Sequence, residues 1–289
     1  MRARRRSLRG VLIHRKLKRL ARAARVLLNT EAPGRKLGAF PDDVFLVSYP
    51  KSGNTWLRFL VGNLVNPHPP VTFANIESRV PSIYLNPESR LRRIQRPRIL
   101  KSHECFAPQY KRVIYLVRDP RDVCISYYHY LIKYRELPEK YPMEDFVARF
   151  VQDDFEGQFG PWGDHVVSWL SMRKSRDAFL LLLYKDLLHD PSRAVAQVAQ
   201  FLGMDASPQE LTKAIDLSSA GRMRDLEKLQ SRQWISTKKS RQDLPFVRAA
   251  VSDQWKSALS HPLVREIEAA WGPTMQTLGY ELSSIDIDG

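Results

Sequence analysis

The residues best placed to do chemistry form a short turn between an apolar segment and a helical pattern. Val44 to Val47 is a run typical of a buried strand, and the apolar positions of residues 55–65 recur at helical spacing. The turn between them, residues 49–55 (YPKSGNT), contains one cation, one glycine and several small polar residues. Backbone N–H groups and the positive end of a helix dipole converge at such a turn, which therefore predicts a phosphate-binding loop.

Two residues of this turn suit an anion in particular. Gly53 lets the backbone approach a ligand closely, and Lys51 adds a full positive charge beside it. The loop of nucleoside triphosphatases has two glycines and places its lysine after them, whereas Lys51 precedes the single glycine here. A strand–loop–helix corner with a surface lysine is the alternative interpretation, because short glycine turns are common in α/β proteins.

The elements that must position this loop alternate along the chain. Strands are predicted at residues 44–47, 98–103, 111–117 and 178–184. Helices are predicted at residues 55–65, 120–134, 143–151, 165–170, 192–202, 208–215 and 256–278. Continuous apolar strands that alternate with helices indicate a single α/β domain with a central parallel β-sheet flanked by helices. Residues 217–250 lack periodicity and are predicted to form a long lid loop.

Charge is concentrated at the N-terminus. The 289 residues are 43% hydrophobic, enough for a core, and carry a formal net charge of +15. Residues 1–36 hold 13 of the 46 Lys and Arg residues and one of the 31 acidic residues, so the remainder is nearly neutral. We therefore expect two parts, a basic amphipathic arm over residues 1–36 and one domain over residues 37–289.

Three interpretations of the arm remain open. It lies on an anionic membrane surface, packs against a partner, or flanks the domain as a solvated helix. Nucleic acid is disfavoured because no aromatic residue is interleaved with the charges. The chain has no run of 18 apolar residues and no secretory signal pattern, and Cys105 and Cys124 cannot form a disulfide framework. We expect a cytoplasmic protein, peripheral at a membrane surface if the arm binds lipid.

Four motifs make residues 40–278 similar to the soluble sulfotransferases that use 3′-phosphoadenosine 5′-phosphosulfate (PAPS). The motifs are residues 49–56 (YPKSGNTW), 100–103 (LKSH), 112–128 (RVIYLVRDPRDVCISYY) and 246–256 (FVRAAVSDQWK). The resemblance implies transfer of a sulfonate group from PAPS to a hydroxyl or amine acceptor in one in-line displacement. It also implies release of 3′-phosphoadenosine 5′-phosphate (PAP) and no metal, and no cluster of residues has the spacing of metal ligands.

The resemblance assigns the first motif to the 5′ end of the donor and to its adenine. The residues concerned are Lys51, Ser52, Gly53, Asn54, Thr55 and Trp56. By resemblance, the first five hold the 5′ phosphate and sulfonate oxygens, and the tryptophan stacks on the adenine. Asn54 replaces a threonine common in the animal members, and its side chain is still able to donate a hydrogen bond.

The 3′ phosphate is assigned by resemblance to Arg118, Ser126 and Arg248. Arginine suits phosphate because its planar fork donates two parallel hydrogen bonds. The alternative for Arg118 is an ion pair with Asp122 at the start of a helix. After Arg248 the family has lysine and glycine, whereas this chain has two alanines, so one cation and the free φ of glycine are lost.

The catalytic assignments also follow from the resemblance. His103 is the expected general base, which takes the proton of the acceptor as the sulfur–oxygen bond forms, and the unperturbed histidine pKa of about 6.5 suits this role. Lys101 is expected to orient the sulfonate, and Lys51 to neutralise charge on the leaving phosphate oxygen. Tyr184 stands at the position of an adenine-contacting tyrosine, and a core tyrosine at a strand end is the alternative.

The acceptor is expected to contact residues 66–97, 133–159 and 218–245, and small-molecule, glycan and lipid acceptors all remain open, as does the oligomeric state. Two other function classes compete with sulfonate transfer. A phosphotransferase would need a magnesium-binding acid at a strand end and a lysine after the glycines, and neither is found in the sequence. A non-catalytic nucleotide-binding or membrane-recruited module would tolerate the two alanines that follow Arg248.

Overall fold

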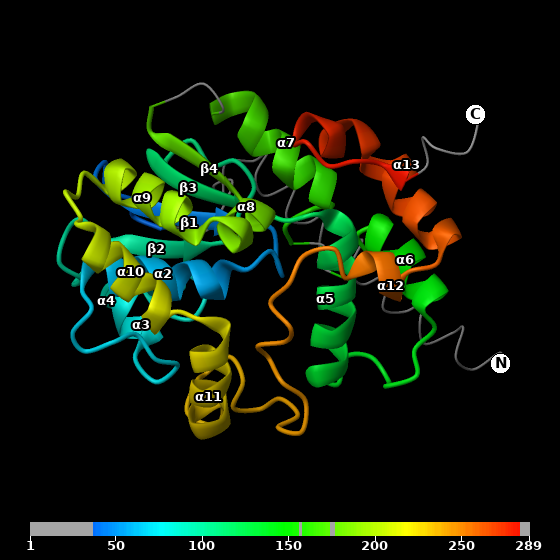
Figure 1. The fold of residues 1–289 in the computed structure, drawn as a ribbon, viewed down its shortest axis with the longest axis horizontal. Helices are drawn as coiled ribbons and strands as arrows, with labels where there is room; N and C mark the ends of the chain where they lie inside the picture. Colours follow the sequence, from blue (N-terminus) through cyan, green and yellow to red (C-terminus); the bar gives the residue numbers. More distant parts are fainter. Residues whose placement is uncertain (1–36, 156–157, 174–176, 284–289) are drawn as a thin grey trace.

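Four apolar segments pair into one parallel sheet at the centre of the fold (Figure 1). They are β1 (Val44–Ser48), β2 (Ile99–Ser102), β3 (Arg112–Val117) and β4 (Phe179–Leu183), in the order β2-β1-β3-β4. The structure is a computed structural model that describes residues 37–155, 158–173 and 177–283. The basic arm predicted for residues 1–36 lies outside the described residues, and those residues form one α/β domain around the sheet.

The strand order places a crevice beside the end of β1. All neighbouring strands are parallel, so their carboxyl ends meet at one edge of the sheet. Val47 of β1 pairs with Ser102 of β2 on one side and with Tyr115 of β3 on the other. The next two strands along the chain therefore lie on opposite sides of β1, so the strand order reverses there. Ligands of open α/β sheets bind at the carboxyl end of the strands at such a reversal.

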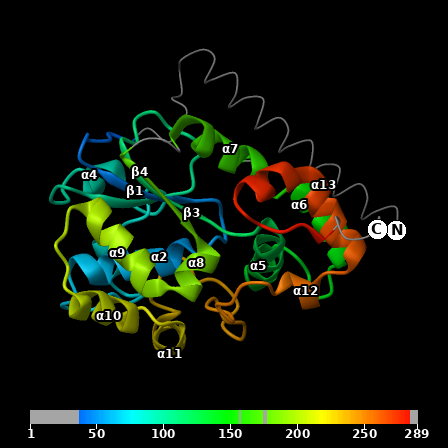
Figure 2. The ribbon, with the colours of Figure 1, turned by 45° about the horizontal axis from the view of Figure 1, so that its top comes forward.

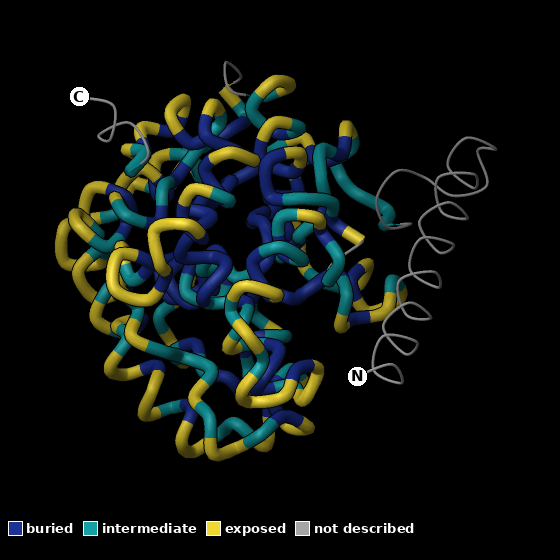
Figure 3. Tube along the Cα trace, turned by 90° about the vertical axis from the view of Figure 1, so that its right-hand side faces the viewer, coloured by how far each residue is buried: buried dark blue, intermediate teal, exposed yellow. Residues whose placement is uncertain are grey.

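Helices cover both faces of the sheet, with α9 and α10 on one side of the strands and α7 on the other (Figure 2). The first face packs against α2 (Asn54–Val65), α8 (Tyr184–His189), α9 (Pro191–Leu202) and α10 (Pro208–Leu217). The second packs against α5 (Pro120–Lys133), α6 (Met143–Val151), α7 (Trp162–Arg173) and α13 (His261–Thr277). Burial on both faces explains the continuous apolar strands, and the buried residues occupy the interior of the trace (Figure 3).

Local signals in the sequence explain where the helices of this core begin and end. Asp119 caps α5 by accepting a hydrogen bond from the N–H of Arg121, with Pro120 in the first turn. Asp190 caps α9 in the same way, and Gly203 ends α9 in the left-handed conformation with φ of 76°. The predicted helix starts at these two Asp-Pro pairs are therefore confirmed.

Four further helices complete the described part of the fold. They are α3 (Ile76–Arg79), α4 (Glu88–Leu91), α11 (Ala220–Gln230) and α12 (Trp255–Ala258). Residues 231–254 connect α11 to α12 without helix or strand and run between α11 and α5 in both ribbon views (Figure 1; Figure 2).

The structure corrects two sequence predictions in this region. The lid loop predicted for residues 217–250 contains α11, which the periodicity missed because Met223 is its one buried apolar residue. Ser219 starts this helix by accepting a hydrogen bond from Arg222. The helix predicted for residues 256–278 is two helices, because Ser260 is extended and proline in the first turn of α13 starts a new helix.

Candidate functional site

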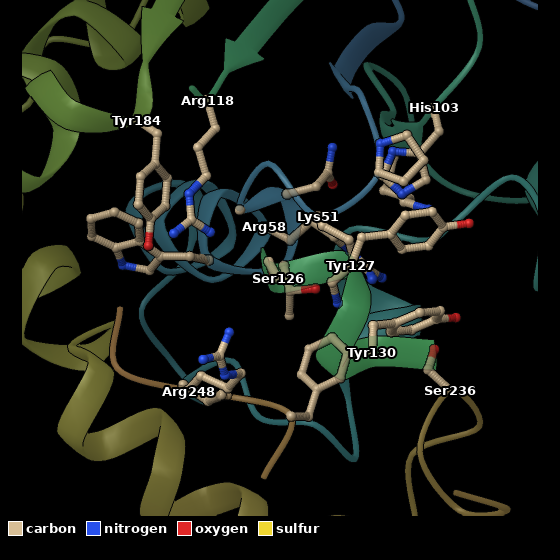
Figure 4. Close-up of a pocket in the computed structure, with 18 of the residues that line it drawn as sticks. Lys51, Arg58, His103, Arg118, Ser126, Tyr127, Tyr130, Tyr184, Ser236 and Arg248 are labelled. Carbon is tan, nitrogen blue, oxygen red and sulfur yellow. The ribbon is translucent and has the colours of Figure 1, made fainter. Parts of the chain in front are cut away.

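A cavity of about 530 Å³ opens at the carboxyl edge of the sheet (Figure 4). Residues near the ends of all four strands line it, together with Ser126 of α5 and Arg248 of the segment after α11. The predicted site residues in the lining are Lys51, Gly53, Asn54, Thr55, Trp56, Lys101, His103, Arg118, Ser126, Tyr184 and Arg248. Ser52 is the one predicted site residue that does not line the cavity, because it is fully buried within the loop. His103 lies across the cavity from Arg118 and Tyr184 (Figure 4).

The loop between β1 and α2 has the backbone shape of an anion site. Lys51 and Gly53 both have positive φ, 67° and 98°, as in the turns that bind anions at helix N-termini, and the Ser52 N–H between them donates to the Tyr49 carbonyl at 3.3 Å. A Cβ on Gly53 would lie 2.7 Å from the Tyr184 ring, so only glycine fits here. The Oγ of Ser52 is buried and has no hydrogen-bond partner among the described residues.

Asn54 braces this loop against the strand before it. Its Nδ2 donates to the carbonyl of Leu46 at 3.2 Å and to the Oγ of Ser48 at 3.1 Å. Both amide hydrogens are therefore used within the chain, although the sequence predicted that this side chain would donate to the donor nucleotide. The backbone N–H of Asn54 lies in the first turn of α2 and has no intrahelical partner. This N–H, rather than the side chain, is the group of Asn54 that suits an anion.

The Lys51 ammonium is held over the faces of two aromatic rings. Its Nζ lies 4.2 Å from the centre of the Tyr130 ring and 4.7 Å from that of Phe246. These cation–π contacts come from α5 and from the segment after α11, so two distant parts of the chain fix the position of this charge.

His103 is oriented as a hydrogen-bond acceptor toward the cavity. Its Nδ1 lies 2.7 Å from the carbonyl oxygen of Ser48, the last residue of β1. A carbonyl only accepts, so Nδ1 carries the proton and Nε2 keeps its lone pair. Burial, followed by the charge of Lys101 and, less strongly, that of Lys51, holds the pKa of His103 well below 6.5, although the bond to Ser48 opposes the shift.

The backbone of His103 is fixed from two sides. Tyr84 Oη accepts a hydrogen bond from the His103 N–H at 2.8 Å, and His165 Nε2 donates to the His103 carbonyl at 3.1 Å. Burial lowers the pKa of His165 to about 4, so this ring is neutral. Its Nδ1 accepts from the Tyr115 hydroxyl at 2.8 Å, which fixes the tautomer.

Arg118 is anchored at the opposite end of the cavity. Its guanidinium lies 4.4 Å from the Tyr184 ring centre and donates to the carbonyl of Val251 at 3.0 Å. The ion pair with Asp122, the alternative drawn from the sequence, is also present at 3.7 Å. Arg118 Nε is nevertheless buried without a hydrogen-bond partner among the described residues, so the ion pair leaves donor capacity unused.

A second arginine approaches the same space. Burial, and then the charge of Arg118, lowers the pKa of Arg248. Both guanidinium groups point into the part of the cavity that Ser126 also faces (Figure 4). Two like charges brought together in a partly buried space form a site for an anion.

The second of the two alanines after Arg248 has a backbone conformation that favours glycine. Ala250 has φ of 53°, in the left-handed region that disfavours residues with a Cβ. Ala250 therefore adopts a conformation that glycine would adopt without strain, and the strain is confined to this residue.

Ala250→Gly is expected to stabilise the fold. The left-handed conformation costs alanine roughly 1–2 kcal/mol, and the extra freedom of glycine in the unfolded chain costs about 0.5–1 kcal/mol. The net gain, about 0.5–1 kcal/mol, is measured as a higher Tm. Ala249→Gly is the matched control, since Ala249 is not among the residues with positive φ, and should lower the Tm. An equal fall in both variants would contradict the left-handed conformation.

Comparison with known proteins now decides the family. The sulfotransferase domain model matches residues 41–279. The chain belongs to the sulfotransferase domain family. Sulfotransferase 1B1 of Canis lupus familiaris is 28% identical over 233 residues, which cover 75% of this chain and 78% of that protein. The 3-beta-hydroxysteroid sulfotransferase of Cavia porcellus is 30% identical over 225 residues, 74% of this chain and 77% of that protein.

Solved structures show the same fold. Retinol dehydratase, in complex with androsterone and the inactive cofactor PAP, matches with a TM-score of 0.70 and 20% identity, over 85% of this chain and 84% of that one. This likeness confirms the prediction of an α/β fold, and the family match confirms the prediction of a sulfotransferase. The phosphotransferase and the non-catalytic module, the two competing hypotheses, are set aside by the family match.

The half of the sulfotransferase cavity around His103 is mainly aromatic. Tyr84 and Phe159 lie beside the histidine ring, with ring centres 6.1 and 5.7 Å from it. The other rings that line the cavity, besides Trp56 and Tyr184, are those of Tyr127, Tyr130, Tyr134, Trp234 and Phe246. No Asp or Glu is among the described residues that line the cavity. Residues 66–97, 133–159 and 218–245, the segments expected to contact an acceptor, each contribute to this lining.

A buried ion pair that the sequence did not reveal supports this half of the cavity. Arg58, which lines the cavity from α2, lies 2.7 Å from Glu77, and both side chains are largely buried. Glu77 also accepts from Ser82 N and Asn86 Nδ2, each at 2.9 Å. This carboxylate thus fixes the segment that carries Tyr84. No pattern relates Arg58 to Glu77, because they lie on different elements.

Three further sequence expectations concern metal, membrane and thiols. Within the described ranges, no group of three His, Cys, Asp or Glu residues is placed to hold a metal ion. No described helix has both the length and the apolar character needed to cross a bilayer. Cys105 and Cys124 form no disulfide within the described residues, and burial raises the pKa of Cys124.

Proposed function

We propose that this sulfotransferase takes the sulfonate from PAPS and releases PAP. The observation that carries the proposal is the joining, in one cavity, of an anion-binding loop, a pair of arginines and a neutral histidine. Arg118 lines the cavity, and its Nε is buried without a hydrogen-bond partner among the described residues, which fits an anionic group of the ligand at that end. PAP is bound by retinol dehydratase, a protein of similar fold.

The residues of the cavity divide among the parts of the donor. Lys51 and the loop residues Gly53, Asn54 and Thr55, which line the cavity, suit the 5′ phosphosulfate. Arg118, Ser126 and Arg248 suit the 3′ phosphate. The adenine is assigned to the space beside Trp56 and Tyr184, whose rings meet edge to face at 5.6 Å. These assignments agree with those implied by the family resemblance.

The chemistry of this chain is proton transfer and charge stabilisation. The donor supplies an electrophilic sulfur whose bond to the phosphate oxygen breaks as a bond to the acceptor oxygen forms. His103 Nε2 takes the acceptor proton, because Nδ1 is already bonded to Ser48 and the ring is neutral. Lys51 stabilises the charge that develops on the leaving phosphate oxygen, and Lys101 holds the sulfonate oxygens.

The aromatic lining favours a small, neutral hydroxyl compound among the small-molecule, glycan and lipid acceptors open from the sequence. A cationic amine would enter a cavity with several cations and no described carboxylate to pair with it. The relative from Cavia porcellus is named for 3-beta-hydroxysteroids, and retinol dehydratase binds androsterone. A cytoplasmic location, attachment of residues 1–36 to an anionic membrane and metal-free transfer stay predictions from the sequence.

Sulfonate transfer is tested directly with PAPS labelled on its sulfonate. The protein is incubated with a neutral phenol, a steroid alcohol or a protonated arylethylamine, and the labelled products are separated. Transfer to one of the neutral alcohols, faster than to the amine, is expected. Faster transfer to the amine would contradict the proposed acceptor class, and an absence of PAP formation with every acceptor would contradict the donor.

The pH dependence of kcat/KM is expected to report the depressed pKa of His103. The base must be unprotonated, so kcat/KM should fall only as the pH drops below 6.5. Lys101→Met removes a charge that depresses this pKa, and the acid limb should move to higher pH. Lys111→Met, at an exposed position outside the cavity, should leave the limb in place. A wild-type limb above pH 6.5 would contradict the account.

A further inference from the structure

We propose that Glu227 and Lys133, which we call the Glu227–Lys133 clip, position residues 241–248 over the donor site. The inference rests on the proposed function, because that segment delivers Phe246 to Lys51 and Arg248 to the 3′ phosphate. Neither residue of the clip lines the cavity, so both act through the segment. They are positioning residues.

Glu227, on α11, holds the segment by its backbone. One carboxylate oxygen accepts from the N–H of Phe246 at 2.5 Å, and the other accepts from the N–H of Val247 at 2.8 Å. Hydrogen bonds to a charged acceptor are roughly twice as strong as neutral ones. Two adjacent amides are thus fixed immediately before Arg248.

Lys133, at the end of α5, holds the same segment from its other side. Its Nζ donates to the carbonyls of Arg241 at 2.8 Å and Leu244 at 2.5 Å. Its own carbonyl accepts from the Arg241 N–H at 2.9 Å. The segment is therefore held between α11 and α5, where both ribbon views place it (Figure 1; Figure 2).

The two side chains require one another. Lys133 is 2% exposed and Glu227 is 7% exposed, and their charged atoms lie 3.8 Å apart. A buried charge that loses its partner is strongly destabilising, so the pair forms as a unit. Only a segment that offers two amides and two carbonyls at these positions completes the hydrogen bonds of both ions.

The held segment reaches both ends of the donor site. The Phe246 ring lies 4.7 Å from Lys51 Nζ, and Arg248 is close enough to Arg118 for the Arg118 charge to lower the pKa of Arg248. Release of the segment would move one wall of the Lys51 site and one of the two arginines. The clip should thus set the affinity for the donor more than the rate once the donor is bound.

Calorimetric titration with PAP tests the clip through Glu227→Gln and Lys133→Met. Each is expected to raise the Kd for PAP about tenfold, while kcat at saturating PAPS changes less than about threefold. Asp225→Asn is the matched control, because Asp225 pairs with Lys228 on the exposed face of the same helix. Its Kd should equal that of the wild type.

A double-mutant cycle separates positioning from a general loss of structure. In the Arg248→Ala background, Glu227→Gln should raise the Kd by only about threefold, because one of the two groups that the clip positions is already absent and Phe246 remains. In the His103→Ala background the full tenfold effect should persist. Equal tenfold effects in both backgrounds, or unchanged Kd values in both single variants of the clip, would overturn the proposal.

Hydrogen exchange in the wild-type protein tests the clip without any substitution. The amides of Phe246 and Val247 should exchange slowly in the free protein, because Glu227 accepts from both. Rapid exchange of these two amides would overturn the clip even if both variants failed to fold. A wild-type protein that protects these amides but does not bind PAP would instead contradict the proposed function.

Discussion

His103→Ala is expected to lower kcat by about 10²- to 10⁴-fold, the range by which a positioned general base accelerates a reaction. Affinity for PAP should remain near the wild-type value, because His103 faces the acceptor side of the cavity, away from Arg118 and Tyr184 (Figure 4). The measurement is the rate of labelled sulfonate transfer at saturating PAPS. The residual activity should also lack the acid limb of the pH profile.

His189→Ala is the control for this substitution. His189 is exposed at the end of α8 and does not line the cavity, so its loss should leave kcat unchanged. If His103→Ala kept more than about a tenth of the wild-type kcat, the assignment of the base would be wrong.

Lys51→Met is expected to impair both donor binding and turnover. Removal of one preorganised charge at a developing oxyanion typically costs about 10²- to 10³-fold in kcat, and the same ammonium contacts the bound donor. Methionine keeps most of the apolar stem between Tyr130 and Phe246, so the cavity should keep its shape. Kinetics and PAP titration together measure the two effects.

The pattern across variants distinguishes Lys51 from a surface charge. Lys111→Met removes an exposed lysine outside the cavity and should change neither kcat nor the Kd. A loss of kcat in Lys51→Met without a loss of PAP affinity would restrict Lys51 to the reacting sulfonate and would contradict its place in the donor site.

The sequence predicts the part of the site that follows directly from the strands. Lys51, His103, Arg118 and Tyr184 each come just after or at the end of an apolar run, and parallel strands bring such positions to one edge. The sheet and the two Asp-Pro helix starts were predictable for the same reason, because their signals are local.

Contacts between distant segments were not predictable. The carbonyl of Ser48 that orients His103 has no side-chain signal, and Glu227 meets Phe246 only through backbone amides. The polar helix α11 was missed because tertiary contacts and the cap at Ser219 form it without an apolar stripe. Ala250 shows the same limit, since the sequence indicates only that a glycine is absent, and the left-handed backbone conformation at this alanine is seen in the structure alone.

The central claim is that the cavity binds the donor nucleotide through Lys51 and leaves His103 free for the acceptor. Calorimetric titration with PAP of the wild type, Lys51→Met and His103→Ala tests this claim most directly, with ATP titrated in parallel. The account predicts micromolar PAP binding that persists in His103→Ala, is lost in Lys51→Met and exceeds that of ATP. Wild-type protein that does not bind PAP, or that binds ATP more tightly, would contradict it.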